Sequence, residues 1–410
     1  MANNFSNTDW VCMEILRLLL NKLVVVDYFN RSWEKEFKRE FAPGDKVTVK
    51  GPQRFIASTG MSWDPQAINR ISTTIALDTW IKVHFEWDDY ERAVKLERSE
   101  EELRDNYWDP AAASMAQEWD SQAADWARHY TSMVVGALGT NPTAVSTYYS
   151  ARQRLLENAC PPGKKAMLVS SSMMSSIGAN ITTLFHPGDE LARAFKEGYL
   201  GRLAGFDFFE SNSLYSHTAG TWAGAVTVNG AGQSGTSLNV NCTSGDTFKK
   251  GDKFSIANVN FVNPATRRVA GPATAKQFTV TADVTASGAT ATLTILPAIY
   301  GPGSQYQNVN ALPAGTAALT LWPGTTSPNG KVGTVGMGIS RYAFAVAGAR
   351  LYVPKAVESA GIAQDTDTGI SIRKVKAWDA ENSKQINRLD SLGGFGNLYQ
   401  DNGAVAVVGA

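Results

Sequence analysis

The sequence has few cysteines and no excess of charge of either sign. Its three cysteines, Cys12, Cys160 and Cys242, are odd in number and far apart in the 410-residue chain. This pattern fits neither a disulfide framework nor a CxxC metal site, and it indicates a reducing compartment. Lysine and arginine together number 38, and so do aspartate and glutamate. Because no net field covers the surface, any contact with nucleic acid must be local.

Long uninterrupted apolar runs are also missing. The run from 11 to 26 has the hydropathy of a signal peptide, but charged residues precede and interrupt it. We interpret it as an amphipathic helix over 8–23 that is opened by Thr8 or Asp9. The other charge-free stretches contain proline, asparagine, serine and glycine, which do not meet the demands of a bilayer span. We therefore expect a soluble intracellular protein without membrane contacts.

Signatures of catalysis and of metal binding are absent. The sequence has no GxSxG motif, no Walker loop and no paired cysteine and histidine signature. None of its four histidines stands three or four residues from another or near a cysteine: His84, His129, His186 and His217. We therefore expect no catalytic residue, no cofactor and no metal ligand.

Two short motifs imitate functional ones. Gly230, Gly232 and Gly235 match GxGxxG after a strand-like run, but a second strand pattern follows where a dinucleotide site needs a helix. A hairpin loop is the better interpretation. Asp365 and Asp367 have the alternating spacing of a calcium loop, but the later carboxylate of such a loop is missing, which favours an ordinary turn.

A change of composition near residue 217, and a second near 329, marks a separate unit. Between them the sequence is rich in Thr, Ala, Gly and Ser, with only nine charged side chains: Asp246, Lys249, Lys250, Asp252, Lys253, Arg267, Arg268, Lys276 and Asp283. Short β-type runs bounded by turn residues recur along it, at 222–228, 236–242, 253–261, 277–282, 289–296 and 316–322. About six antiparallel strands without helices predict a small barrel or sandwich.

Extended segments precede the longest helix signal. Residues 46–50, 71–77 and 79–87 have strand patterns, and we interpret the segment as a long two-stranded arm or loop. An amphipathic helix over 110–138 follows, about 43 Å long at roughly 1.5 Å per residue, with Asp109 as its cap. Such a rod suits an elongated subunit. We expect four tryptophans on these segments to pack in the core: Trp80, Trp87, Trp119 and Trp126.

The remaining segments predict a domain that is split by an insertion. An α/β portion follows residue 142, with helices over 143–158, 171–179 and 188–199 and a strand over 166–170. The β-unit then intervenes, and strand-rich sequence resumes after Asn329 and runs to the last residues.

The segment from Glu86 to Asp125 is strongly acidic, with thirteen carboxylates against four basic residues. It is either a solvated face or a contact surface for basic residues of a neighbouring subunit, and the two interpretations are compatible. The basic candidates lie in the N-terminal segment: Arg31, Lys35, Lys38 and Arg39.

Three segments resemble one family. EGYLGRLAGFDFFESNSL at 197–214 resembles the motif before the inserted domain in coat proteins of short-tailed lambdoid phages. FKKGDKFSIANVNFVNPATRRV at 248–269, followed by KQFTVTAD, resembles the telokin-like inserted domain of that family. The C-terminal segment at 369–408 resembles the closing strands of tailed-phage coats. The order of elements in the first third of the chain agrees.

The resemblance implies an α+β protein with the Johnson fold of tailed-phage capsids. It implies the following parts: an N-terminal arm (1–41), an extended loop (42–88), a peripheral domain with the spine helix (89–140 and 367–410), an axial domain (141–216 and 329–366) and an inserted, all-β telokin-like domain (217–328). In relatives, a long charged loop early in the inserted domain reaches a neighbouring capsomer. Here the short, uncharged NGAGQSG at 229–235 takes its place. Arg267 and Arg268, or a decorating protein, would then supply any such contact.

The expected function is that of a major capsid protein, not an enzyme. Copies would form hexamers and pentamers of an icosahedral head, build a procapsid with scaffolding and portal proteins in the host cytoplasm, and expand as DNA is packaged. Many weak contacts between copies would add to a stable shell. The alternative is a secreted carbohydrate-binding or adhesion protein with an Ig-like β-domain, which predicts a secretion signal and repeats that the sequence lacks.

Overall fold

The computed structural model divides the chain into two compact units, each made of separate segments. The first unit contains 1–49, 73–123 and 345–396, and the second contains 50–72, 124–344 and 397–410. The structure describes residues 7–30, 46–50, 55–56, 60–61, 65–66, 68, 72–88, 104–181, 201–222, 224–269, 274–322, 329–341, 343–354, 357–365, 369–398 and 403–410. Within these residues, no helix is both long and apolar enough to cross a bilayer.

The first unit packs helices on a five-stranded sheet. Its helical elements are α1 (Asn7–Lys22), the 3₁₀ helix η1 (Val26–Tyr28), the π-helix η2 (Arg104–Trp108) and the start of α5 (Asp109–Tyr130). The sheet consists of β3 (Thr79–Asp88), β18 (Phe344–Ala349), β19 (Ser359–Gln364), β20 (Ser371–Asp379) and β21 (Lys384–Asn397), in the order β18-β21-β20-β19, with β3 beside β21. A small sheet pairs β1 (Lys46–Lys50) with β2 (Ser72–Ala76).

Strand β21 fits closely among its neighbours because it carries glycines. A Cβ atom added at Gly393 would lie 2.2 Å from the Trp119 ring of α5, and one at Gly394 would lie 1.7 Å from the carbonyl oxygen of Ala76. These separations are far below van der Waals contact, so only glycine fits there. Phe395 then packs edge-on against Trp119, with ring centroids 5.9 Å apart.

The N-terminal helix is held to α5 by one buried carboxylate. Asp120 of α5 accepts hydrogen bonds from the backbone N–H groups of Val24 (2.7 Å), Val25 (3.0 Å) and Val26 (3.0 Å). These donors lie between the end of α1 and the start of η1, where helical partners are missing. The side chain of Asp120 therefore caps this turn, because it accepts hydrogen bonds from backbone N–H groups that lack a helical partner.

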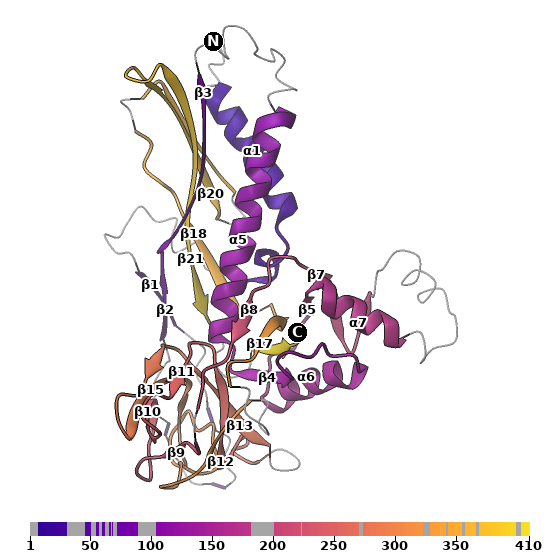
Figure 1. The fold of residues 1–410 in the computed structure, drawn as a ribbon, viewed down its shortest axis with the longest axis vertical. Coiled ribbons are helices and arrows are strands. Elements are labelled where there is room, and N and C mark those ends of the chain that lie inside the picture. Colours follow the sequence, from indigo (N-terminus) through magenta and orange to yellow (C-terminus); the bar gives the residue numbers. More distant parts are fainter. Residues whose placement is uncertain are drawn as a thin grey trace. The chain divides into compact units, whose positions relative to one another are not determined.

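The second unit contains a seven-stranded sheet with two helices. Its elements are β4 (Met133–Gly136), α6 (Val145–Glu157), β5 (Lys165–Val169), α7 (Ser171–Ile181), β6 (Arg202–Leu203), β7 (Phe206–Glu210), β8 (Ser216–Thr218), β17 (Val332–Ser340) and β22 (Ala404–Val408). The strands follow the order β4-β22-β17-β5-β7-β6, and β8 pairs with β17. Helices α6 and α7 lie beside this sheet (Figure 1). Their side chains, such as Tyr148 and Met173, form one core with strands β5, β7 and β22.

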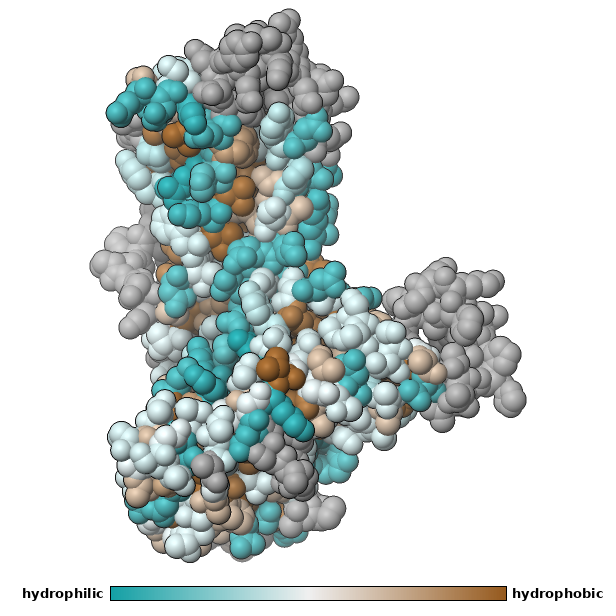
Figure 2. Space-filling view, in the orientation of Figure 1, coloured by the Kyte–Doolittle hydropathy of each residue, from teal (hydrophilic) through white to brown (hydrophobic). Residues whose placement is uncertain are grey.

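The same unit contains a second, six-stranded antiparallel sheet, which we call the β-domain. Its strands are β9 (Thr227–Val228), β10 (Gly235–Asn241), β12 (Lys253–Asn260), β13 (Ala275–Val280), β15 (Thr290–Ile299) and β16 (Leu319–Leu321), in the order β16-β12-β13-β15-β10-β9. A short pair, β11 (Thr247–Phe248) and β14 (Val284–Thr285), lies beside it. Buried residues from 222 to 321 form its own core. Its visible surface is mostly pale in Figure 2, as expected for few charged side chains.

Most expected elements are confirmed. All six β-type runs of the 217–328 segment overlap strands of the β-domain, and the structure is mixed α+β. The helices expected over 8–23 and 143–158 correspond to α1 and α6. The N–H of Gly369 donates to the carbonyl of Asp365, but residues 366–368, where the turn is expected, lie outside the described residues. The helix expected over 188–199, Asp367, His186 and the basic N-terminal candidates lie outside the described residues.

Two expectations about the N-terminal half are wrong, and a third is confirmed only in part. The helix expected over 110–138 ends at Tyr130, and residues 133–136 form strand β4. A short buried strand has an apolar run that also fits a helix stripe, so periodicity did not separate the two. The two-stranded arm or loop expected over 46–87 is confirmed in part, because β1 pairs with β2, but β3 pairs along its whole length with β21. Thr8, Asp9 and Asp109 lie within helices and do not precede them.

The tryptophan prediction is confirmed only in part. Trp119 is fully buried, and Trp126 is half-buried and stacks on Tyr130 with ring centroids 4.4 Å apart. Trp80 is instead 48% exposed, and its indole N–H donates to Asp390. Alternation along a strand puts every second side chain on the solvent face, where Trp80 lies. The Trp87 side chain is outside the described residues.

Candidate functional site

The β-domain is joined to the rest of the second unit by polar side chains. From β13, the Gln277 amide accepts a hydrogen bond from the Val134 N–H (2.9 Å) and donates one to the Val134 carbonyl (3.2 Å). Thr279 donates from its hydroxyl to the carbonyl of Thr131 at 2.7 Å. The Gln277 side chain thus forms with the backbone of β4 the pair of hydrogen bonds that a neighbouring strand would form. We call these contacts, together with those of Asp252 and Lys253 described next, the seam.

Lys253 supplies a buried positive charge at the end of helix α5. Its ammonium donates to the carbonyls of Arg128 (3.1 Å) and Gly251 (3.3 Å). The last carbonyls of a helix lack internal partners and carry partial negative charge, so a cation there is favourable. Burial lowers the pKa of Lys253 to about 7, against the opposing effect of neighbouring Asp252. The ammonium is therefore near its point of neutralisation at physiological pH.

Asp252 is a buried carboxylate that ties the same turn to strand β8. It accepts hydrogen bonds from the N–H groups of Gly220 (3.1 Å) and Lys249 (2.8 Å). One of its oxygens lies 2.8 Å from the ring nitrogen Nε2 of His217. One side chain therefore holds both the first chain crossing into the β-domain, near 220, and the turn formed by residues 249–253.

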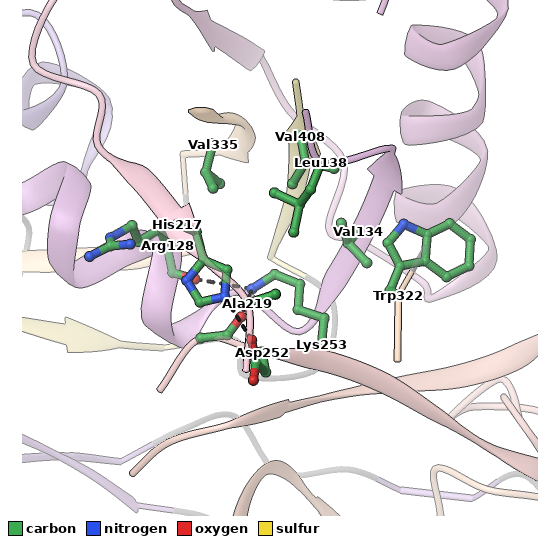
Figure 3. Close-up of a pocket in the computed structure, with 11 residues that line it drawn as sticks. Arg128, Val134, Leu138, His217, Ala219, Asp252, Lys253, Trp322, Val335 and Val408 are labelled. Atoms are coloured by element: carbon green, nitrogen blue, oxygen red, sulfur yellow. Dashed lines mark hydrogen bonds and ion pairs between the residues drawn. The ribbon is translucent and has the colours of Figure 1, made fainter. Parts of the chain in front are cut away.

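Gly251 lets this turn approach two histidines. Its φ is +97°, in the left-handed region that glycine tolerates. A Cβ atom there would lie 3.0 Å from the His129 ring and 3.3 Å from the His217 ring. Among the residues that line the adjoining pocket, Arg128, His217, Asp252 and Lys253 give polar atoms, while Val134, Leu138, Trp322, Val335 and Val408 give apolar ones (Figure 3).

His129 is held neutral in these surroundings. Burial, together with the positive charges of Arg128, Lys250 and Lys253, lowers its pKa to about 4 against the opposing effect of Asp125. The histidines expected to be scattered are thus partly brought together, since His129 and His217 meet at Gly251 while His84 lies on exposed β3. Within the described residues no group of three His, Cys, Asp or Glu side chains suits a metal ion.

This seam is not predicted from the sequence. A signal was present, because five of the nine charged residues of the 217–328 segment lie between Asp246 and Lys253. A cluster of charges in a segment that otherwise avoids them indicates a local role. Its partners Arg128, His129 and His217 come from elsewhere in the chain, and spacing gives no indication that they converge.

The loop at 229–235 closes on itself. The side-chain amide of Gln233 donates to the carbonyls of Asn229 (2.6 Å) and Asn239 (3.0 Å), and its oxygen accepts from the Asn239 N–H (2.7 Å). It therefore forms the hairpin loop predicted for the GxGxxG motif, not a dinucleotide site. Elsewhere in the β-domain, Arg267 donates to the carbonyl of Ser304 at 2.7 Å, while Arg268 is exposed.

Replacing Gln277 with alanine is expected to destabilise the full-length chain by about 2 kcal/mol, because the N–H and carbonyl of Val134 both lose a buried partner. Urea denaturation followed by circular dichroism measures this. Gln153→Ala is the matched control, since Gln153 is exposed on α6 and bonds only locally to Glu157. Equal effects of the two substitutions would contradict the role given to Gln277.

Comparison with known proteins identifies the class. The P22 coat protein family, described as gene protein 5, matches residues 1–396, and the chain belongs to this family. It is a structural shell protein and not an enzyme: a major capsid protein of tailed phages, which self-assembles into the icosahedral shell of the virion. This confirms the expected class, and the adhesion alternative is left without support.

The chain is also similar to several solved structures. The chain is similar to a protein of Mycobacterium phage Che8, with 13% identity, a TM-score of 0.45 and coverage of 94% of this chain and 90% of the other. It is similar to the capsid of Ralstonia phage GP4, with 8% identity, a TM-score of 0.48 and coverage of 95% and 91%. It is similar to a virus-like particle from Pyrococcus furiosus, with 5% identity, a TM-score of 0.42 and coverage of 98% of this chain and 99% of the other. No curated protein matches.

Proposed function

We propose that the chain forms hexamers and pentamers that build a procapsid around a scaffolding protein, and that the shell expands as DNA is packaged. The observation that carries this proposal is the family match over residues 1–396. Assembly takes place in the host cytoplasm, and a portal protein occupies one vertex. Each subunit uses modest contacts on many neighbours, which multivalency converts into a stable shell.

We propose the five parts named from the sequence as the functional division of the subunit. The six-stranded β-domain falls within the proposed insertion at 217–328, and α5 falls within the peripheral segment at 89–140. Helix α6 and strands β5 and β7 fall within the axial segment at 141–216. The N-terminal arm at 1–41 and the extended loop at 42–88 add contacts with neighbouring subunits, while α1 and β3 within them also pack in the first unit.

Contacts between capsomers come from a different place than the loop at 229–235. That loop carries no charge, and Gln233 uses its hydrogen-bonding groups internally. Exposed Arg268, or a decorating protein, supplies the contact instead. Contacts with packaged DNA are weak and local, which fits equal numbers of basic and acidic residues.

Electron microscopy of the purified chain tests the assembly proposal. The chain is expressed with and without a candidate scaffolding protein from the same phage. We expect closed procapsid-sized shells with the partner, and capsomers or irregular shells without it. Failure to form either shells or capsomers under both conditions would overturn the proposal, and identical closed shells under both would remove the role of scaffolding.

A further inference from the structure

Strand β3 lies at the edge of the five-stranded sheet. Its residues, Thr79–Asp88, pair with β21 in continuous register on one side. Among the residues that the structure describes, no strand pairs with its other side, which we call the outer side. The backbone groups on the outer side of an edge strand can be bonded by a second chain that adds a strand to the sheet. The outer side of β3 is therefore suited to dock another extended segment.

Most devices that protect an edge strand from other chains are absent from β3. Protected edge strands are commonly short, bulged or interrupted by proline. Strand β3 has ten residues, contains neither proline nor glycine, and shows no shift in its register with β21. Charge is the device that it does have, because Lys82 and Glu86 are exposed on it. Charges on an edge exclude most partners and select one that carries opposite charges at matching positions.

The polar face of β3 is complementary to itself. Alternation along the strand puts four exposed side chains on this face: Trp80, Lys82, His84 and Glu86. In an antiparallel pair of two β3 strands with His84 opposite His84, Lys82 of each copy lies opposite Glu86 of the other. Glu86 also pairs with Lys384 at 2.6 Å, but its side chain is still 55% exposed, and a carboxylate accepts several hydrogen bonds.

The length of the strand restricts the register of such a pair. Two copies related by a two-fold axis present the polar face on the same side only if even-numbered residues lie opposite even-numbered ones. The two longest overlaps of this kind run over 79–87 and over 80–88. The first puts Lys82 opposite His84. The second puts Lys82 opposite Glu86 twice, once from each copy, and is therefore favoured by charge.

We propose that β3 pairs with β3 of a second copy of this chain, antiparallel and centred on His84, and that this pairing joins two subunits of the shell. The occupant is a second copy because the chain belongs to a family of coat proteins, and because the charges of β3 match those of its own sequence. An icosahedral shell contains two-fold axes, where a self-complementary contact fits. The inference deepens the proposed shell function and rests on the assembly of copies, but not on scaffolding or expansion.

Cysteine cross-linking of the full-length chain tests the pairing. Directly opposite residues of antiparallel strands have Cα atoms about 4.5–5.5 Å apart, which a disulfide can span. Under mild oxidation with diamide, His84→Cys is expected to give at least about tenfold more disulfide-linked dimer than Lys82→Cys on non-reducing electrophoresis. Lys82→Cys is the matched control on the same face, because the two copies of residue 82 would lie about 13 Å apart.

Charge reversal tests the two ion pairs. Lys82→Glu and Glu86→Lys each replace two attractive pairs with two repulsive ones, and each is expected to raise the concentration needed for assembly about tenfold. The double variant Lys82→Glu/Glu86→Lys restores both pairs with exchanged signs, and it is expected to assemble within about twofold of the wild type. Urea denaturation of each variant checks that the subunit itself remains folded.

Cross-linking is measured both on assembled shells and on the concentrated, unassembled chain. Failure to build shells around a scaffolding protein would therefore count against the proposed procapsid and leave this test intact. The pairing of β3 is overturned if His84→Cys gives no more linked dimer than Lys82→Cys in both samples, or if the double variant assembles no better than the single ones. A different segment docked on β3 would give the same negative result, since the two copies of residue 84 would not meet.

Discussion

Replacing Asp390 with alanine is expected to lower the stability of the chain by about 3–5 kcal/mol, because the change leaves buried positive charge without its counter-charge. Asp390 is fully buried in the five-stranded sheet. It accepts hydrogen bonds from Arg373, from Arg388 (2.8 Å) and from the indole of Trp80 (3.1 Å). Three side chains from three strands therefore lose their common acceptor in one substitution.

Urea denaturation at pH 7 measures the effect of Asp390→Ala. Glu86→Ala is the control in the same sheet, since Glu86 pairs with Lys384 in an exposed position and is expected to cost at most about 1 kcal/mol. Burial raises the pKa of Asp390, but the hydrogen bonds from Arg373, Arg388 and Trp80 outweigh it and hold the pKa below its ordinary 3.8. Its contribution is thus complete above pH 3.8 and is lost as the pH falls further. Similar losses of unfolding free energy in Asp390→Ala and Glu86→Ala would refute this account.

Asp120→Ala is expected to cost about 3–5 kcal/mol, because it removes the acceptor for three backbone N–H groups at Val24, Val25 and Val26. Glu118→Ala, on the exposed face of the same helix, is expected to change stability by no more than about 0.5 kcal/mol. Thermal and urea denaturation of both variants provide the comparison. If Asp120→Ala behaves like Glu118→Ala, the carboxylate does not hold the N-terminal helix.

The same substitution predicts a distinct pH dependence. Burial raises the pKa of Asp120 to about 6, although the three backbone hydrogen bonds act to lower it. The folded state therefore binds this proton more tightly than the unfolded state. The resulting stabilisation is complete below pH 3.8 and is lost as the pH rises through about 6. The stability difference between wild type and Asp120→Ala is expected to widen over that interval on acidification.

Local sequence patterns predicted the helices and strands whose formation depends mainly on neighbouring residues. Alternation and turn residues located all six strands of the β-domain, and helical periodicity located α1 and α6. The end of helix α5 was missed because Lys253, which lies 125 positions away in the sequence, binds the carbonyl of Arg128. A distant residue that terminates a helix leaves no trace in the helix's own sequence.

The seam could not be predicted from the sequence for the same reason. The charge cluster around Asp252 and Lys253 is visible in the sequence, but its meaning depends on partners more than thirty positions away. The pairing of β3 with β21 is similar, since Asp88 lies opposite Lys384. The function was therefore predicted from the resemblance to a family and not from the spacing of residues in the sequence.

The segmented first unit has a consequence for synthesis on the ribosome. Its early part ends at residue 123, and its sheet needs residues 345–396, so more than two hundred residues are made in between. At roughly 5–20 residues per second this interval lasts about 10–45 s. During that time Ile75 and Trp119 lack the strand that covers them, because β21 has not been made. The unit that begins first is therefore complete only after residue 396 has been made, and until then its apolar side chains are exposed to other chains and to chaperones.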